Sequence, residues 1–474
     1  MTINTAFLFL VALLSACAPL ASKPGFDAVQ NLVATRTPHT LAWPQSHAER
    51  EAQHQTLAAA LQSPLTLESA VRAALLGNPN LQADYEKLGV AYGDLIQAGL
   101  PANPALSFSL SSSSIGIGRE FGVVQEVVSL LALAPRKRLA NAMFDEVKLQ
   151  TAQRVLALAS DVKKAFYDVH AAQELLKLET QATATAAAAS ELAQGQFDAG
   201  NIGTRELALR QEFHARAVLQ QTRQELALAE SREHLSRLMA LPGDMRNGTL
   251  ETLAPDPDVL VPSLNSVEER ALRERFDIAA SSRQVERLAD ALGVADRFRY
   301  LSMLGVGLNF ARETDGEKRH GPSVTLGLPL WDRNQGSRFR MQAELRESER
   351  NLEALMLDTR RDVRNAHARL VNAQQTLQHF RTTILPLHER IVAETLKFYN
   401  GMLLGVYDLL AAKQNQQDAQ RAYIEMTKMY QLAKVDLEHA TGGNELANTN
   451  EQKVVVPQTK PEPEHHDHHR KDPP

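Results

Sequence analysis

Apolar residues along this chain follow two periods, and the longer one occurs twice. Near residue 155 and again near residue 363, they recur at alternating intervals of three and four. That spacing places side chains on one face of a helix and is typical of coiled-coil packing. It predicts two helices of about sixty residues, each about 90 Å long. The first ends near Gln196, and the second begins at Ser337 and is kinked at Pro386. The first seam is Val155, Leu158, Val162, Ala165, Val169, Ala172 and Leu176; the second seam is Val363, Ala366, Leu370, Ala373, Leu377, Phe380, Ile384, Leu387 and Ile391.

A period of two marks short strands beside these helices. Alternation of apolar with small or polar residues is clear at 106–110, 304–310 and 324–330. A fourth strand is expected from Phe121 to Leu130, with turns at 112–119 and 312–320. Strands of this length can cross a membrane when tilted. The alternative is half-buried edge strands of a soluble α+β domain. It is disfavoured because the sequence shows no further strands for pairing and the adjoining helices are too long for a compact domain.

The remaining helical segments complete a tandem duplication. Each half consists of a shorter helix, a strand hairpin, a long helix, a turn and a final helix, offset by about two hundred residues. The shorter helices are expected at 66–99, with Thr66 as N-cap and an interruption at Asn78-Pro79, and at 266–298, with a capping box of Ser266 and Glu269. The final helices are expected at 204–240 and 406–441.

The turns before the final helices correspond in sequence. Phe197-x-x-Gly200 matches Phe398-x-x-Gly401, and Glu206-Leu207 matches Asp408-Leu409 with one extra residue in the second copy. The predicted organisation is therefore a signal peptide at 1–16, a lipidated extended segment at 17–64, a first repeat at 65–240, a linker at 241–264, a second repeat at 265–442 and a disordered tail at 443–474.

The one cysteine, Cys17, follows an apolar run and the small residues Ser15 and Ala16. This order resembles the lipobox of bacterial lipoproteins, in which diacylglycerol is attached to the cysteine; Ala18 after it favours the outer membrane by the same resemblance. The alternative is an ordinary signal peptide with a chance cysteine. Residues 1–5 contain no Lys or Arg, which leaves the true start codon open. One acylated residue anchors only modestly, so we expect further membrane contacts.

Composition narrows the class of protein. The net charge of −5 provides no basic field for nucleic acid, and no run of eighteen apolar residues follows the first twenty, so no transmembrane helix is expected. Four strands cannot close a barrel, and an open sheet edge is not tolerated in lipid. Several chains must therefore pool their strands. We expect a homo-oligomeric barrel continued by a tube of helices.

These features resemble the TolC-like outer-membrane efflux factor family over about residues 60 to 442. The resemblance rests on Asn103-Pro104 before the first strand, the junction Leu328-Pro-Leu-Trp-Asp-Arg-Asn-Gln-Gly336, the two Phe-x-x-Gly turns and the duplication. The junction is most similar to the heavy-metal (CzcC/CusC-type) branch. The family implies a mainly α fold with a small transmembrane β part: a trimer with a twelve-stranded β-barrel and a twelve-helix periplasmic α-barrel. It also implies a passive duct that docks on a periplasmic adaptor and an inner-membrane RND-type pump.

No catalytic motif or cofactor site is evident. The sequence contains no phosphate loop, no Gly-x-Ser-x-Gly and no His-Glu-x-x-His, which argues against an enzyme. The resemblance places the closed aperture and the adaptor contact at the two turns, with glycines Gly200, Gly203, Gly401 and Gly405. Asp198, Glu394 and Asp408 are the candidate charges there. A ring of three carboxylates, one per chain, would bind cations; the alternative is surface charges that cap helix ends.

Two other groups of residues are candidates for a role. Trp331, Asp332 and Arg333 are expected to form a collar at the membrane interface, with Trp331 at the headgroup level, as a structural joint. The tail offers His465, His466, His468 and His469 as ligands for Cu, Zn or Ni, or is a polar segment without a role.

Three functions are compatible with these features of the sequence. The first is an outer-membrane, lipid-anchored efflux duct extending into the periplasm, with heavy-metal cations as the favoured cargo. The second is a drug-efflux or type I secretion duct of the same fold. The third is a periplasmic coiled-coil scaffold without a pore. The sequence does not identify the metal, the pump or the resting state of the tip.

Overall fold

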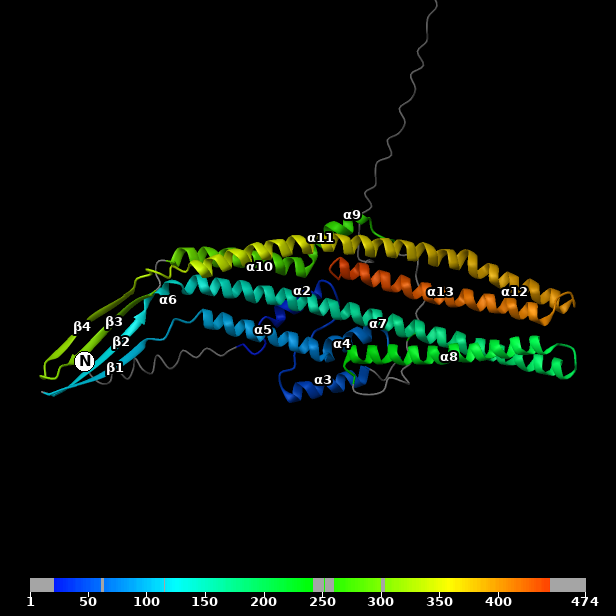
Figure 1. The fold of residues 1–474 in the computed structure, drawn as a ribbon, viewed down its shortest axis with the longest axis horizontal. Helices are drawn as coiled ribbons and strands as arrows, with labels where there is room; N and C mark the ends of the chain where they lie inside the picture. Colours follow the sequence, from blue (N-terminus) through cyan, green and yellow to red (C-terminus); the bar gives the residue numbers. More distant parts are fainter. Residues whose placement is uncertain are drawn as a thin grey trace, which may run out of the picture.

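The computed structural model describes residues 21–60, 64–114, 116–241, 251, 260–299 and 303–443 of the chain. The protein is elongated (Figure 1). A four-stranded sheet forms one end, shorter helices surround the middle, and two antiparallel helix pairs extend to the other end. The signal peptide, Cys17 and the histidine tail lie outside the described residues. Among those residues, no helix is long and apolar enough to span a bilayer.

The first repeat follows the predicted order. It contains α4 (Leu67–Gly77), α5 (Pro79–Ala98), β1 (Ala105–Ser113), β2 (Gly116–Glu126), α6 (Val127–Leu131), α7 (Leu133–Asp198) and α8 (Thr204–Met239). The predicted N-cap Thr66 is confirmed, since its hydroxyl accepts from the Ser69 amide. The predicted interruption at Asn78-Pro79 is also observed, and the side chain of Asn78 accepts from the amides of Asn80 and Leu81 to cap α5. The second strand begins five residues and ends four residues earlier than predicted, because Val127–Leu131 forms the short helix α6.

The second repeat has the same order with two breaks. It contains α9 (Leu264–Glu274), α10 (Phe276–Phe298), β3 (Met303–Arg312), β4 (Lys318–Gly327), α11 (Gln335–His379), the π-helix η2 (Phe380–Ile384), α12 (Leu385–Asn400) and α13 (Val406–Ala440). The predicted single helix at 266–298 is wrong: Arg275 is extended, because its guanidinium binds Asp277 and the Ala440 carbonyl. The N-cap is Ser263, whose hydroxyl accepts from the Ser266 amide, so the predicted Ser266–Glu269 box is also wrong.

The four strands form one antiparallel sheet in the order β1-β2-β3-β4. Leu106, Phe108 and Leu110 remain exposed on one of its faces, as do Leu308 and Phe310. The other face carries serine and glycine, and the side chains of Ser107 and Asn309 stand where a Cβ on Gly122 would be. Strand β4 ends at Gly327, three residues before the predicted end at Leu330, because Pro329 cannot donate to a ladder.

The extended segment predicted at 17–64 is wrong over two stretches. Residues Phe26–Ala34 form α2 and His47–Ala60 form α3. Helix α2 buries Val29 and Val33 in the core of the first repeat, which also contains Trp43. The ring of Phe26 meets that of Tyr85 edge-on at 5.2 Å. The extended segment was predicted from its prolines, and Pro24, Pro38 and Pro44 all lie outside the two helices. Burial of the apolar side chains of α2 stabilises this helix.

The two seams differ in where they are buried. In α7, Val155, Val162, Ala165, Val169 and Ala172 are buried as predicted, and burial continues to Ala193. In the second repeat, Val363, Ala366, Leu370, Ala373 and Leu377 are buried, but Leu387 and Ile391 are exposed. In α12, which follows the π-helix, the buried residue is Val392, one position after the predicted Ile391.

The π-helix accounts for this shift. In the part of the long helix that precedes the π-helix, equivalent buried residues of the two repeats are 201 residues apart, as with Val162 and Val363. At the turns the offset is 202, because Gly200 and Met402 are the left-handed residues that end α7 and α12. A π turn accommodates one additional residue in a helix. The extra residue of the second copy therefore lies at 380–384 and not in the turn.

Candidate functional site

The end of the molecule away from the sheet is formed by the α7–α8 and α12–α13 turns, which we call the tip (Figure 1). Both turns close with the same hydrogen-bond pattern. The Asn201 amide donates to the Gln196 carbonyl, and the Leu403 amide donates to the Phe398 carbonyl. Gly203 and Gly405 are the extended N-caps of α8 and α13. The predicted match of Gly200 with Gly401 is off by one residue, since Met402 takes the left-handed position and Gly401 is only the C-cap.

Each candidate carboxylate at the tip is exposed and has a local partner. Asp198 accepts from the amide side chain of Gln194 at 2.8 Å, and Glu394 Oε1 lies 2.8 Å from Lys397 Nζ. Asp408 Oδ2 accepts from the Gly405 amide at 3.0 Å and caps α13. Within the described residues, no group of three or more His, Cys, Asp or Glu is placed to hold a metal ion. In one protomer these charges stabilise helix ends.

The contact between the repeats at the tip uses residues that the sequence analysis missed. Tyr407 donates its hydroxyl to Gln196 Oε1 at 2.6 Å, and the guanidinium of Arg210 lies 4.2 Å from the Tyr407 ring centroid. Arg210 also binds Glu206 one turn earlier on α8, with its Nε 3.1 Å from Oε1. The Glu206–Arg210 spacing was the only signal available in the sequence. This cluster connects α13 to α7 and α8 of the first repeat.

Four ion pairs continue that contact along α7 and α13. They are Arg421–Glu179 at 2.8 Å, Lys428–Asp168 at 3.1 Å, Lys163–Glu438 at 3.1 Å and the shorter Lys164–Asp436. Arg421 donates a hydrogen bond to Glu179, a nearly fully buried carboxylate, and this bond raises the pKa of Arg421. These ion pairs, which we call the ladder, fix α13 of the second repeat on α7 of the first.

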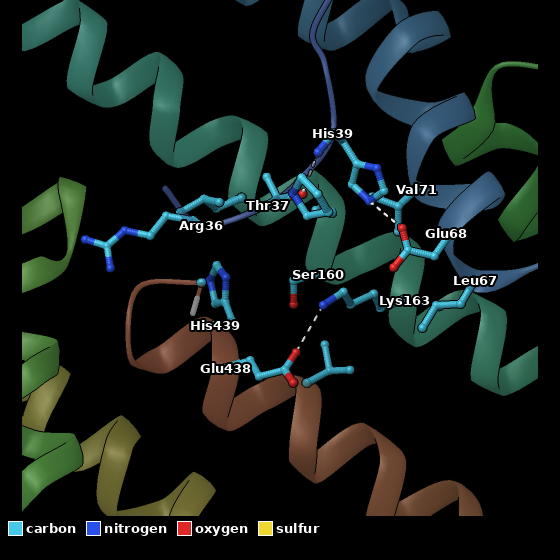
Figure 2. A pocket seen from close by; sticks show the side chains of 15 residues that line it. Arg36, Thr37, His39, Leu67, Glu68, Val71, Ser160, Lys163, Glu438 and His439 are labelled. Carbon is cyan, nitrogen blue, oxygen red and sulfur yellow. Dashed lines mark hydrogen bonds and ion pairs between the residues drawn. The ribbon is translucent and has the colours of Figure 1, made fainter. Parts of the chain in front are cut away.

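A small cavity lies where the N-terminal segment meets both repeats (Figure 2). His39 Nε2 is 3.5 Å from Glu68 Oε2 on one side, and the Lys163–Glu438 pair closes the other. Burial lowers the pKa of His439 at the end of α13, so its neutral form is favoured. Because the acidic groups of this cavity are already paired with bases, it serves as a joint between chain segments.

The predicted collar residues begin α11 through local hydrogen bonds. Asp332 Oδ1 accepts from the Asn334 amide at 2.8 Å, and Gln335 donates to the Trp331 carbonyl at 3.1 Å. Asn334 adopts the left-handed conformation with φ 63° and precedes the helix. Trp331 is 87% exposed, and the backbone amide of Arg333 donates to Gln335 Oε1. The strand-to-helix turn is therefore built locally, and the indole faces outward.

The fold is shared with solved outer-membrane channels. The protein superposes on the outer membrane channel CmeC of Campylobacter jejuni with a TM-score of 0.69 at 17% identity, covering 81% of this chain and 86% of that one. It superposes on CusC with a TM-score of 0.66 at 13% identity, covering 80% and 92%.

The sequence is also similar to that of a metal-resistance protein. The chain is 27% identical over 399 residues to the cobalt-zinc-cadmium resistance protein CzcC of Cupriavidus metallidurans, covering 78% of this chain and 88% of CzcC. No family model matches the sequence. The resemblance to the TolC-like outer-membrane efflux factors and their heavy-metal branch is confirmed by the similarity to CzcC and by the fold shared with these channels.

Proposed function

We propose that the protein is the outer-membrane exit duct of a tripartite efflux system. It conducts substrate passively from an RND-type pump and a periplasmic adaptor to the exterior and is not an enzyme. The observation that carries the proposal is the uncovered apolar face of the four-stranded sheet, which leads directly into helices as long as α7. Exposed apolar strands with polar opposite faces suit lipid on one side and a water-filled lumen on the other.

The assembly we propose is a homotrimer with a twelve-stranded barrel and a twelve-helix tunnel. The two free edges of the sheet, β1 and β4, support it because an open edge is unsatisfied in lipid. The exposed Leu387 and Ile391 of α12 supply apolar surface for a neighbouring chain. Native mass measurement of the detergent-solubilised protein tests this; a monomer under all conditions would refute it.

Heavy-metal cations are the proposed cargo, and the relationship to CzcC supports them. A strain that lacks the protein should become sensitive to cobalt, zinc or cadmium, and the full-length gene should restore resistance. Sensitivity to hydrophobic drugs with unchanged metal tolerance would favour a drug-efflux duct instead. Purified protein should also form pores in planar bilayers. Absence of conductance would favour the scaffold without a pore.

The tip is the proposed aperture and adaptor contact, with Asp198, Glu394 and Asp408 contributing charge in the trimer. Because Tyr407 links α13 to Gln196, its hydroxyl holds the two turns of one protomer together. Tyr407→Phe removes a hydrogen bond of about 1 kcal/mol and keeps the ring over Arg210. The open fraction of single channels should rise about fivefold, whereas Tyr399→Phe at an exposed position should leave it unchanged.

Attachment to the membrane by Cys17 and metal binding by the tail are parts of the same proposal. Cys17→Ser should abolish incorporation of labelled fatty acid if the lipobox is used. Removal of residues 444–474 should lower the number of Cu or Zn ions bound per chain if His465, His466, His468 and His469 are ligands. Unchanged stoichiometry would leave the tail as a polar segment.

A further inference from the structure

Three basic side chains form a row across the outer end of the sheet. In the strand register, Arg119 pairs with Arg312, and Arg312 pairs with Lys318. Leu110 of β1 completes the row beside Arg119. The row lies next to the hairpin turns, at the end of the sheet away from the helices (Figure 1). All three basic residues are exposed, and the row spans about 10 Å at the usual spacing of strands.

This row shares the apolar face of the sheet. Two residues along each strand, toward the helices, the register aligns Phe108, Phe121, Phe310 and His320. The next row is Leu106, Val123, Leu308 and Pro322. Side chains two residues apart point to the same face and lie about 7 Å apart along the strand. The face therefore changes from aliphatic to aromatic to cationic toward the hairpin turns.

The charges of the row have no counter-ion within the described residues. No ion pair there involves Arg119, Arg312 or Lys318, and Glu120 is on the opposite face because it is adjacent to Arg119 in the strand. In the hairpin, Glu313 is paired with Arg319 at 2.9 Å. Like charges directly opposite each other on neighbouring strands are destabilising. A row of three therefore favours an anion from outside the chain.

The order of the rows identifies where that anion lies. Aromatic side chains on membrane strands mark the interface between hydrocarbon and headgroups. The cationic row is one step beyond them, at the level of the headgroups, and long Arg and Lys side chains reach polar groups while their stems stay on apolar surface. Guanidinium groups bind phosphate in a bidentate manner.

From this placement we propose that Arg119, Arg312 and Lys318 form a binding site for phosphate groups of lipid headgroups in the outer leaflet. The inference rests on the proposed function, because it requires the sheet to be in the membrane. The occupant is a phosphorylated membrane lipid, whose acyl chains lie against the aliphatic rows while its phosphates neutralise the cations. The site fixes the depth of the sheet in the bilayer.

The test measures binding of bisphosphorylated lipid A to the full-length protein in detergent by native mass spectrometry. Dephosphorylated lipid A and inorganic phosphate are the comparison ligands. The wild-type protein should bind the bisphosphorylated lipid at least tenfold more tightly than the dephosphorylated one, and millimolar inorganic phosphate should not displace it. In R119Q/R312Q/K318Q the affinity for the bisphosphorylated lipid should fall about 100-fold, at about fivefold for each of the three cations, and the preference over the dephosphorylated lipid should be lost.

The matched control removes the same charge elsewhere. R340Q/R350Q/R361Q lies on the exposed surface of α11, and its lipid preference should equal that of the wild type. Equal affinity of the wild-type protein for the two lipids would overturn the inference, and this comparison needs no variant to fold. An equal loss in the control would also overturn it, since net charge alone would then explain binding.

Pore formation separates this inference from the proposed function. If the wild-type protein conducts in bilayers of pure phosphatidylcholine but shows no preference for phosphorylated lipid, only the headgroup site is refuted. If it neither conducts nor forms oligomers, the duct itself is refuted, and the headgroup site with it.

Discussion

The two repeats have the same elements but bury different numbers of apolar side chains. In the first, α7 is a single helix of 66 residues whose buried face extends as far as Ala193. In the second, the equivalent helix is divided by the π-helix η2, and in the following helix α12 only Val392 is buried. The first repeat also has the larger core, and the N-terminal segment adds Val29, Val33 and Trp43 to it.

This difference assigns distinct mechanical roles to the two repeats. The first repeat has the larger buried core and forms the more stable frame. The second is attached to that frame by the ladder and leaves Leu387 and Ile391 exposed. The half that opens or contacts other chains should be the one with less internal burial, since low local burial gives low local stability. Four predictions test this comparison.

The largest effect should come from breaking the ladder. Arg421→Leu leaves the carboxylate of Glu179, whose side chain is 3% exposed, without its partner on α13. Removal of one member of a buried ion pair costs about 3–5 kcal/mol. The thermal unfolding midpoint, followed by circular dichroism in detergent, should fall by several degrees. Lys428→Met is the control, because its pair with Asp168 is more exposed and is worth less than about 1 kcal/mol. Equal effects of the two substitutions would contradict the role of Glu179.

The second prediction compares the two parts of the second seam. Leu377 is fully buried, so Leu377→Ala should cost about 2–5 kcal/mol and lower the unfolding midpoint. Leu387 is 47% exposed in the protomer, so Leu387→Ala should change helix content little and weaken oligomerisation instead. Circular dichroism and native mass measurement separate the two effects. A Leu387→Ala protein that stays fully oligomeric would show that this surface is not an interface.

The third prediction concerns the two turns of the tip. Met402 has φ 58° and Gly200 has φ 76°, a region that costs about 1–2 kcal/mol for a residue with a Cβ. Gly200→Met should therefore increase hydrogen exchange of the amides around residue 200. Met402→Gly should slow exchange around residue 402, by less, because glycine also loses more entropy on folding. Gly401→Ala is the control and should have little effect, as its φ of −79° suits any residue.

The smallest effect should be seen on acidification. Burial is the main cause that lowers the pKa of His439, while Arg275 and Lys164 lower it further and Asp161 and Asp277 oppose them. The unfolded chain then binds more protons, so stability is complete above the ordinary histidine pKa of about 6.5 and is lost as the pH falls below it. His439→Asn should reduce the loss of stability between pH 7.5 and 5.5, whereas His379→Asn on the exposed side of α11 should not. An unchanged pH profile in His439→Asn would refute this assignment.

Periodicity in the sequence was sufficient for the long helices, the strands and the duplication. The seams were predicted correctly wherever a helix packs within its own chain, from Val155 to Ala172 and from Val363 to Leu377. The break at Arg275 could not be predicted, because it depends on a contact with Ala440, which is 165 residues away. The helices α2 and α3 of the N-terminal segment were not predicted, because the prolines that flank them indicated an extended chain.

The site was less predictable than the fold. Asp198, Glu394 and Asp408 were chosen by charge near a turn, and the structure shows each with a partner in its own segment. The residues that join the repeats, Gln196 and Tyr407, are 211 residues apart and form no local pattern. The cationic row likewise follows from strand register, which fixes Arg119 opposite Arg312 only once the strands are paired.

The single extra residue at 380–384 has a consequence for how the molecule is inherited. The π turn absorbs this residue, so the side chains of α12 keep the rotational phase that they would have in a copy without it. Loss of one codon in this segment would remove the wide turn and leave Leu387 and Ile391 on the same exposed face. A gene that arose by doubling thus carries three additional nucleotides in one half without a change in which face of the helix meets its neighbour.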